Sequence, residues 1–374
     1  MSYPFTEDQQ LIRKNARDFA QQYLEPLAVP LDKSGDFPAE AVRKMAEHDF
    51  LGWFLPAAYG GAEVGYLSYV LGVEELSRAS AAVAAIVVNH AAAAYAINRW
   101  GTAEQKQKYL PEMAKGRRLG AVAMAEPGPA VGEGPEAVVA AKQGDRFVLK
   151  GRKSYVANAG VADVYVVFAC TDAAAGAKSM TAFVVDAKAA GLAVGPKKTT
   201  MGLRGRPTAD VVFDNTPADV LGDGNGGAAI ALELLAVTGV AEAAQTVGVV
   251  AAAVAHAAKY SQQRIQFGRP IAAFQAIQTL LAEVATNCHV ARLAVYDAAN
   301  LIERGEPFTA EAAMVKIFAQ RLGMKSLLDT MQVEAGYGYS EEMLMAKLFR
   351  DVSGTTILEN PLDFPEKLVA ASIA

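Results

Sequence analysis

The chain is poor in the residues that disulfide frameworks and metal centres need. Its 374 residues include two cysteines and four histidines. Cys170 and Cys288 lie far apart and offer no metal-ligand spacing, a usage typical of a reducing compartment in which thiols stay free. His90 and His256 lie in alanine- and valine-rich helical stretches, where a packed histidine is the ordinary case. The sequence therefore predicts no metal site and a cytoplasmic location.

An excess of positive charge is also missing. The 35 lysines and arginines are outnumbered by 40 acidic residues, and they are spread along the chain, which gives a net charge of -5. This distribution gives no electrostatic reason to expect nucleic acid or an anionic membrane as a partner. The first ten residues lack a basic region followed by an apolar one, so we expect no export signal.

Long apolar runs that could cross a membrane are not predicted either. The run 247–258 is rich in alanine and valine, but His256 interrupts it and Lys259 follows it. Such a run is shorter and less uniform than a membrane-spanning segment requires. We expect it to be a buried helix, and we expect no membrane partner.

The hydrophobic content of 52% is enough for more than one packed core, and the hydrophobic pattern changes twice along the chain. Thr6 and Gln9 form a capping-box pattern ahead of an amphipathic helix over 6–24. Further helical stretches are predicted over the ranges 38–49, 66–79, 80–99 and 102–115. The first unit, residues 1–118, is therefore predicted to be helical.

A second unit, residues 119–222, is predicted to be an antiparallel β domain, because short β-branched and aromatic runs alternate with glycine, asparagine and aspartate. In the third unit, residues 223–374, the helical period returns over the ranges 228–263, 270–303 and 309–334. Three long helices stack naturally as a bundle of the four-helix type. The predicted class is α+β, with a β domain between two helical domains.

This layout and several motifs resemble the FAD-dependent acyl-CoA dehydrogenase family over residues 5 to about 360. The two clearest motifs are Arg264-Ile-Gln-Phe-Gly-Arg-Pro270 and Gln332-Val-Glu-Ala-Gly-Tyr-Gly-Tyr339. Weaker matches, in the same order as in the family, are Tyr59-Gly-Gly61, Gly101-Thr-Ala-Glu-Gln105, Glu126-Pro127, Gly151-Arg-Lys-Ser154, Met201-Gly-Leu-Arg-Gly205 and Leu348-Phe-Arg-Asp351.

The resemblance implies FAD as the cofactor and a flavin held between subunits. Its pyrophosphate and adenosine would contact Arg264, Phe267, Gln332 and Gly336 of a neighbouring chain. A planar guanidinium suits a diphosphate, and a glycine lets backbone approach a ligand closely. The residues implied around the flavin ring of the chain's own site are Met124, Ala125, Tyr155 and Ala157. The chain should therefore form an oligomer, with a homotetramer as the first expectation.

The resemblance also implies the reaction. A carboxylate removes the α-proton of an acyl-CoA thioester while hydride from the β-carbon passes to flavin N5, and the electrons then go to an electron-transfer flavoprotein. Counting from Arg350 and Asp351 places the family's catalytic glutamate at Glu359. A dry pocket is needed to raise the pKa of such a base. The residues implied along the acyl group are Val131, Leu235, Thr238 and Gly239.

The chain also departs from the family pattern, which leaves alternatives open. Asn360 and Pro361 follow Glu359 where glycine and threonine are usual, so Glu359 could instead begin an exposed turn. Alanine stands at positions 125 and 157, where the family has threonine. Valine stands at position 131 where serine is usual, and Gly239 takes the place of an arginine. An acyl carrier protein could then replace CoA as the carrier.

The substituted positions are those implied to contact the flavin ring and acyl group of the chain's own site. The residues implied to contact the FAD of a neighbouring chain match the family pattern. The chain could therefore be a non-catalytic or half-catalytic subunit that completes a partner's FAD site in a hetero-oligomer. Some family members carry the catalytic glutamate at the position of Thr238, and Glu242 lies one helical turn further on as an alternative base. A different flavin chemistry on the same fold is a further alternative, because fold alone does not settle function.

Overall fold

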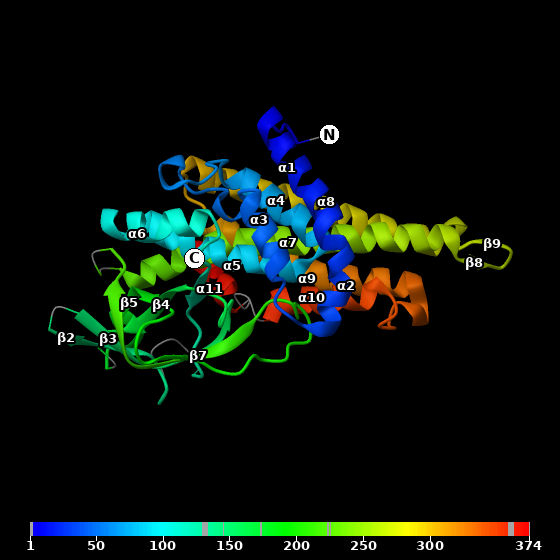
Figure 1. Cartoon of the computed structure of the whole chain (residues 1–374). Helices are drawn as coiled ribbons and strands as arrows, with labels where there is room; N and C mark the ends of the chain where they lie inside the picture. The colour runs from blue at the N-terminus through cyan, green and yellow to red at the C-terminus, as the bar shows by residue number, and fades with distance from the viewer. Residues whose placement is uncertain are drawn as a thin grey trace.

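The computed structural model describes residues 3–128, 134–144, 146–172, 174–222, 224, 226–357 and 363–373. Figure 1 shows a helical part, a β part and a second helical part in chain order, and the long helices of the second helical part run side by side. The predicted α+β class is confirmed. The domain limits at residues 118 and 222 remain predictions.

The N-terminal part is helical as predicted. Its elements are α1 (Glu7–Phe19), a π-helical turn (Ala20–Leu24), α2 (Glu25–Ser34), α3 (Ala39–Glu47), α4 (Tyr66–Ala79), α5 (Ala81–Trp100) and α6 (Ala103–Ala114). The capping box is present, because the Gln9 amide donates to the Thr6 hydroxyl at 3.2 Å and the Thr6 amide donates to the Gln9 side chain at 3.0 Å. Helix α2 was not predicted, since it holds Pro26 in its first turn and Pro30 in its interior.

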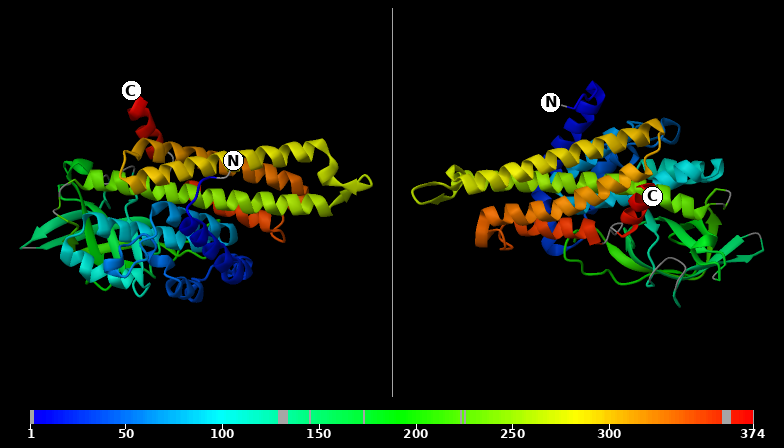
Figure 2. Two further views of the ribbon diagram at one scale, coloured as in Figure 1. Left: turned by 90° about the horizontal axis from the view of Figure 1, so that it is seen from above. Right: turned by 180° about the vertical axis from the view of Figure 1, so that it is seen from behind.

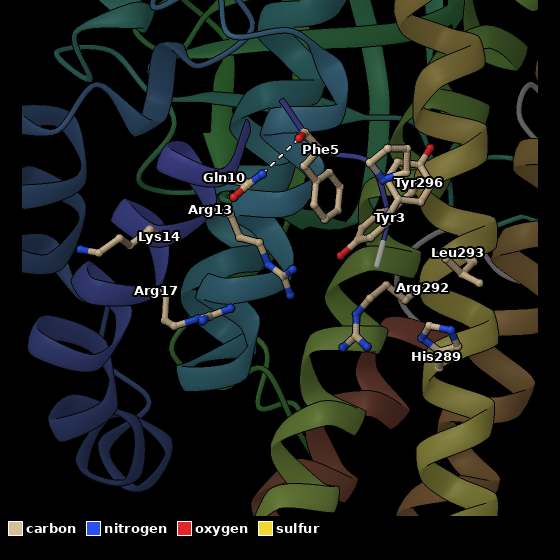
Figure 3. Close-up of a pocket in the computed structure, with 11 residues that line it drawn as sticks. Tyr3, Phe5, Gln10, Arg13, Lys14, Arg17, His289, Arg292, Leu293 and Tyr296 are labelled. Carbon is tan, nitrogen blue, oxygen red and sulfur yellow. Dashed lines mark hydrogen bonds between the residues drawn. The ribbon is translucent and has the colours of Figure 1, made fainter. Parts of the chain in front are cut away.

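Buried carboxylates of α4 tie this helix to α1 and to a helix of the second helical part. Glu75 of α4 accepts hydrogen bonds from Arg13 at 2.8 Å and Arg17 at 2.7 Å, and Glu74 accepts one from Arg292 of the later helix α8 (Gln275–Arg304) at 2.8 Å. These arginines line a surface pocket between α1 and α8 (Figure 3). Both carboxylates are almost fully buried, so the arginines compensate charges that could not otherwise be buried.

The β part is one sheet built mainly from antiparallel pairs. Its strands are β1 (Gly120–Ala123), β2 (Val139–Gln143), β3 (Arg146–Ala157), β4 (Val164–Cys170), β5 (Met180–Asp186), β6 (Leu192–Val194) and β7 (Thr208–Val220). The sheet order is β1-β4-β2-β3-β7-β5, with β6 beside β7. Strand β1 pairs in parallel with β4, a detail that the alternation of residues did not reveal. Both faces of β4 are buried, which fits its unbroken apolar sequence.

The C-terminal part is a bundle. It consists of α7 (Gly227–Gln263), α8, α9 (Thr309–Glu334), α10 (Leu344–Ile357) and α11 (Asp363–Ile373). Helix α8 starts at Gln275 and not at residue 270 as predicted, because β8 (Ile265–Gln266) and β9 (Arg269–Pro270) form a hairpin that a short 3-10 turn follows. Figure 2 shows this hairpin projecting from one end of the bundle, and Figure 1 shows the sheet at the other end.

Two helices, Ala81–Trp100 and Gly227–Gln263, are long and apolar enough to cross a membrane by length and composition alone. In each, 83% of the most apolar stretch is buried inside the molecule. Helix α5 packs against α7 and β1, and α7 packs against α4 and α9, so both helices lie in the protein core. The expectation that the alanine- and valine-rich run over 247–258 is a buried helix agrees with this packing.

Candidate active site

Three of the four residues predicted to hold a neighbour's FAD meet at the end of α7. Arg264, Gln332 and Gly336 line one pocket of about 650 Å³, together with Tyr260 and Tyr337. Arg264 directly follows α7, and its amide still donates to the Tyr260 carbonyl at 2.8 Å. Gln332 lies in the last turn of α9, and Gly336 lies in the 3-10 turn that follows. The pocket is therefore formed where α7 and α9 end together.

The chemistry of this pocket suits a diphosphate joined to a nucleoside. The Arg264 guanidinium lies 5.8 Å from the centre of the Tyr337 ring, so an aromatic face supports a permanently charged group. A Cβ added at Gly336 would meet no protein atom within 4 Å, which leaves its backbone open to a ligand. Tyr337 is a residue that sequence reasoning did not assign, although it lies directly beside Gly336. These residues fit the adenosine and pyrophosphate of FAD.

Phe267 does not line this pocket. It lies at the tip of the β8–β9 hairpin with φ of 51°, and 93% of the residue is exposed. Its ring packs edge-on against Phe274 at 6.1 Å, and the Arg269 guanidinium lies 4.3 Å from the centre of the same Phe274 ring. Apart from this contact the side chain is open to the surroundings, so another molecule could reach it.

Beneath the same pocket, Glu334 is fully buried beside His256. The His256 Nε2 and Glu334 Oε1 atoms lie 3.3 Å apart. Burial raises the pKa of Glu334 to about 7, whereas burial and the nearby Lys259 lower the pKa of His256. Sequence reasoning interpreted His256 as a packed histidine. The structure adds an acidic neighbour that the spacing of 78 residues along the chain could not reveal.

This pair predicts a pH dependence of stability. The Glu334 carboxyl keeps its proton to higher pH in the folded chain than in the unfolded chain, so the free energy of unfolding falls as pH rises from about 4.5 to about 7. Glu334→Gln should flatten the curve in that window, as measured by urea unfolding at several pH values. The lowered pKa of His256 makes the free energy of unfolding rise with pH below about 6.5, and it does so in both proteins. The difference between the two curves therefore reports the contribution of Glu334. Identical curves for the two proteins would contradict the assignment.

Ala335 connects α9 to the 3-10 turn in a conformation that normally requires glycine. Its φ is 52° and its ψ is -134°, and its side chain is exposed. Because a Cβ is strained there, Ala335→Gly should raise the free energy of unfolding by about 1 kcal/mol. The matched change Ala285→Gly, at an exposed position inside α8, should lower it by about 1 kcal/mol. A destabilised Ala335→Gly protein in denaturant titrations would show that the strain is absent.

The four residues predicted around the flavin ring also lie together, in the β part. The Ala125 carbonyl accepts the Ser154 amide at 2.8 Å, and the Met124 carbonyl accepts Lys153 Nζ at 2.8 Å. The segment of Met124 and Ala125 therefore lies beside the end of β3, which carries Tyr155 and Ala157. Tyr155 is half-exposed with φ of 52°, and Lys198 Nζ lies 4.5 Å from the centre of its ring. Ala157 is buried and offers no hydroxyl.

A buried ion pair holds this arrangement. Lys153 Nζ lies 2.6 Å from Glu126 Oε1, and both side chains are fully buried. Burial lowers the pKa of Lys153 to about 8, and the Glu126 carboxylate opposes that shift. Glu126 also accepts the Val138 amide at 3.0 Å. The pair joins the segment of Met124 and Ala125 to two strands, which fixes where its backbone lies.

The three residues predicted along the acyl group on α7 divide between two small cavities. Thr238 faces a cavity between α4, α5 and α7, where the lining aromatic residues are Phe54, Tyr66, Tyr69 and Tyr95. Leu235 and Gly239 line a cavity between α7, α9 and α11, together with Lys316 and Leu368. Each cavity has a volume of about 10 Å³, roughly that of one water molecule. The structure therefore separates Thr238 from Leu235 and Gly239.

Glu242 is buried in an ion pair with Lys316 of α9. Burial raises the pKa of Glu242, and the Lys316 ammonium opposes that shift. Lys316 Nζ also donates to the Thr355 carbonyl of α10 at 3.3 Å. The carboxylate that the sequence left open as an alternative base is thus engaged in holding three helices together, and we assign it a structural role. The only sequence signal for such a partner was a glutamate placed within an alanine- and valine-rich part of the helix.

Glu359 and Val131 lie outside the described residues. The nearest described residue before Glu359 is Ile357, which ends α10. Helix α10 packs against α9 and against α7, the helix that carries Leu235, Thr238 and Gly239. The role of Glu359 as the catalytic base stays a prediction.

Family models cover almost the whole chain. The acyl-CoA dehydrogenase N-terminal domain matches residues 6–117, the middle domain matches residues 121–216 and the C-terminal domain matches residues 225–372. The chain belongs to the acyl-CoA dehydrogenase family. The resemblance found in its motifs is thereby confirmed, and FAD is the cofactor of this family.

Relatives of this acyl-CoA dehydrogenase family member match from end to end. A 3-(aryl)acrylate reductase of Clostridium sporogenes is 40% identical, with 99% of each chain covered. An acyl-CoA dehydrogenase of Bacillus subtilis is 38% identical, covering 98% of this chain and 97% of that one. The subunit CarC of the caffeyl-CoA reductase-Etf complex of Acetobacterium woodii is 34% identical, with 99% of each chain covered.

Solved structures agree with the fold. Butyryl-CoA dehydrogenase from Megasphaera elsdenii matches with a TM-score of 0.95 and 33% identity, with full coverage of both chains. A chain from a structure of the electron transferring flavoprotein of Acidaminococcus fermentans matches with a TM-score of 0.96 and 35% identity, covering 100% of this chain and 99% of that one.

Proposed function

We propose that this acyl-CoA dehydrogenase family member is an FAD-dependent enzyme that removes hydrogen from the α- and β-carbons of an acyl thioester. The observation that carries the proposal is the pocket in which Arg264, Gln332 and Gly336 converge at the ends of α7 and α9. A guanidinium, an amide and an open glycine backbone at one place are groups that suit the diphosphate and adenosine of FAD. FAD supplies the hydride acceptor for the reaction.

The residues of the chain supply binding and proton transfer. Glu359 takes the α-proton, and a site closed to water favours a base with a raised pKa. Backbone amides near the thioester oxygen stabilise the negative charge that develops there. Tyr155 and the backbone of Met124 and Ala125 form the surface for the flavin ring, and the Lys153–Glu126 ion pair holds that backbone in place.

The flavin site is completed by a second copy of the chain. The residues for the adenosine lie at the end of α7, whereas those for the flavin ring lie in the sheet, which packs at the start of α7. A helix of 37 residues is about 55 Å long, more than one dinucleotide can span. One chain therefore contributes the ring surface and another contributes Arg264, and a homotetramer places both at every site.

We also propose an acyl-CoA substrate, an electron-transfer flavoprotein as the redox partner and a cytoplasmic location. The family membership supports the substrate class. One relative is named for a complex with Etf, and one structural neighbour comes from an electron transferring flavoprotein structure; both support the partner. The net charge of -5 and the spread of basic residues give no reason to add nucleic acid or membrane to this set.

An anaerobic titration tests the proposed function. The purified chain should be yellow, and acyl-CoA substrates of increasing length should bleach the flavin absorbance without any added reductant. If no acyl-CoA bleaches a flavin-loaded protein, and bleaching occurs only after a reductant is supplied and oxygen is then consumed, the dehydrogenase proposal is wrong.

A second candidate is a subunit that completes the FAD site of an unlike partner. The buried Ala157, which lacks the hydroxyl of the usual threonine, is the observation that favours it. In that case the chain expressed alone stays colourless and cannot be reconstituted with FAD. Adding the partner chain would then restore the flavin, and Glu359 would not matter for turnover.

A further inference from the structure

The cavity that Thr238 faces has a polar end inside an apolar, aromatic wall. Its lining includes Val88, Ala91, Ala92 and Ala241 beside the aromatic side chains. Two of its tyrosines use their hydroxyls elsewhere, because Tyr66 donates to the Val237 carbonyl at 2.5 Å and Tyr95 donates to Glu233 at 2.9 Å. These two contacts fix the rings, so the shape of the wall is set.

Tyr69 differs from the other two tyrosines. The residue is 3% exposed, and among the described residues its hydroxyl has no hydrogen-bond partner. Its ring is held by Phe54 at 5.4 Å and Tyr66 at 5.4 Å. Tyr69 lines the cavity together with Thr238. A buried hydroxyl without a partner costs free energy unless a ligand or a water satisfies it.

Thr238 supplies a second hydroxyl at the same cavity. Within the described part of the chain it, too, has no hydrogen-bond partner, although threonines in helices often bond to the preceding turn, as Thr246 does to the Glu242 carbonyl at 3.1 Å. A volume of about 10 Å³ holds a single oxygen-sized group and no further carbon chain. Two unpaired hydroxyls thus face a space large enough for one polar group.

We propose that this cavity recognises a hydroxyl group at the far end of a short acyl chain, and that Tyr69 and Thr238 are the residues that determine this specificity. The inference rests on the proposed function and on the place beside the acyl group that the family resemblance implies for Thr238. A site built to bond a substrate hydroxyl discriminates against the analogue without it, because its own polar groups are then left unpaired. The substrate class is a short ω-hydroxyacyl thioester.

The test compares butyryl-CoA with 4-hydroxybutyryl-CoA on the flavin-loaded enzyme. The wild-type protein should favour the hydroxylated thioester by about tenfold in kcat/KM, mostly through KM, because the hydroxyl lies away from the reacting carbons. Tyr69→Phe keeps the ring and removes the oxygen, and Thr238→Val keeps the shape and removes the hydroxyl. Each should bring the ratio of the two substrates close to one.

Tyr109→Phe is the matched control, because Tyr109 is a buried tyrosine of α6 outside this cavity, and it should keep the wild-type ratio. A wild-type ratio near one, or a preference that survives both substitutions, would overturn the inference and leave the proposed function intact. If neither thioester is oxidised, the proposed function fails. In that case calorimetry measures the Kd of each thioester for the wild-type and Tyr69→Phe proteins. The inference holds if the wild-type protein binds 4-hydroxybutyryl-CoA more tightly than butyryl-CoA and Tyr69→Phe does not.

Discussion

Glu359→Gln should lower kcat for acyl-CoA oxidation by about 10³- to 10⁴-fold while the protein stays yellow, because glutamine fills the same space but cannot accept the α-proton. Stopped-flow measurement of flavin bleaching under anaerobic conditions isolates this step from electron transfer to a partner. Substrate binding should persist, since it depends on other residues. The variant therefore separates proton removal from binding.

Glu366→Gln is the matched control for that experiment. Glu366 is an acidic residue of α11 that forms an exposed ion pair with Arg321, and exposed pairs contribute little to stability. Its replacement should leave the bleaching rate within about twofold of the wild-type value. If Glu359→Gln retains full activity in a flavin-loaded homo-oligomer, Glu359 is not the base, and another group of this chain removes the α-proton.

Arg264→Ala should weaken FAD binding by about 10³-fold, because two charge-assisted hydrogen bonds to a diphosphate contribute roughly 4 kcal/mol together. The flavin content after gel filtration, and the Kd for FAD added back to the apoprotein, measure the effect. The side chain lies at the pocket edge, so the fold should persist. The loss should be equal at every site of a homo-oligomer.

Arg269→Ala provides the comparison for Arg264. Arg269 lies two residues beyond the hairpin tip, and its guanidinium packs on Phe274 outside the pocket. Its replacement removes one positive charge from the same hairpin, so a purely electrostatic effect would appear equally in both variants. If Arg264→Ala and Arg269→Ala retain FAD to the same extent, the pocket at the end of α7 is not the diphosphate site.

The sequence was sufficient for much of the fold. Thr6 and Gln9 marked the start of α1, and the hydrophobic period separated the helical parts from the sheet, because capping and periodicity are local properties. Helix α2, which contains two prolines, was not predicted. The first lies in the opening turn, where no backbone donor is lost, and Pro30 is accommodated further along the helix.

The candidate site was only partly predictable, for a different reason. Arg264, Gln332 and Gly336 could be assigned because each belongs to a local motif. The partners Glu334 and His256, or Glu242 and Lys316, meet only when α7 and α9 pack together, and no spacing along the chain encodes that contact. The role of Tyr69 could not be predicted for the same reason. It differs from Tyr66 and Tyr95 only in the folded chain, where those two tyrosines donate hydrogen bonds to Val237 and Glu233.

The central claim, an FAD site built from two copies of this chain, is tested most directly by purifying the chain alone and recording its absorption spectrum and native mass. The account predicts flavin bands near one FAD per chain and the mass of a homo-oligomer, with the flavin bands lost in Arg264→Ala. A colourless protein that FAD does not reconstitute, or a yellow monomer, would contradict it.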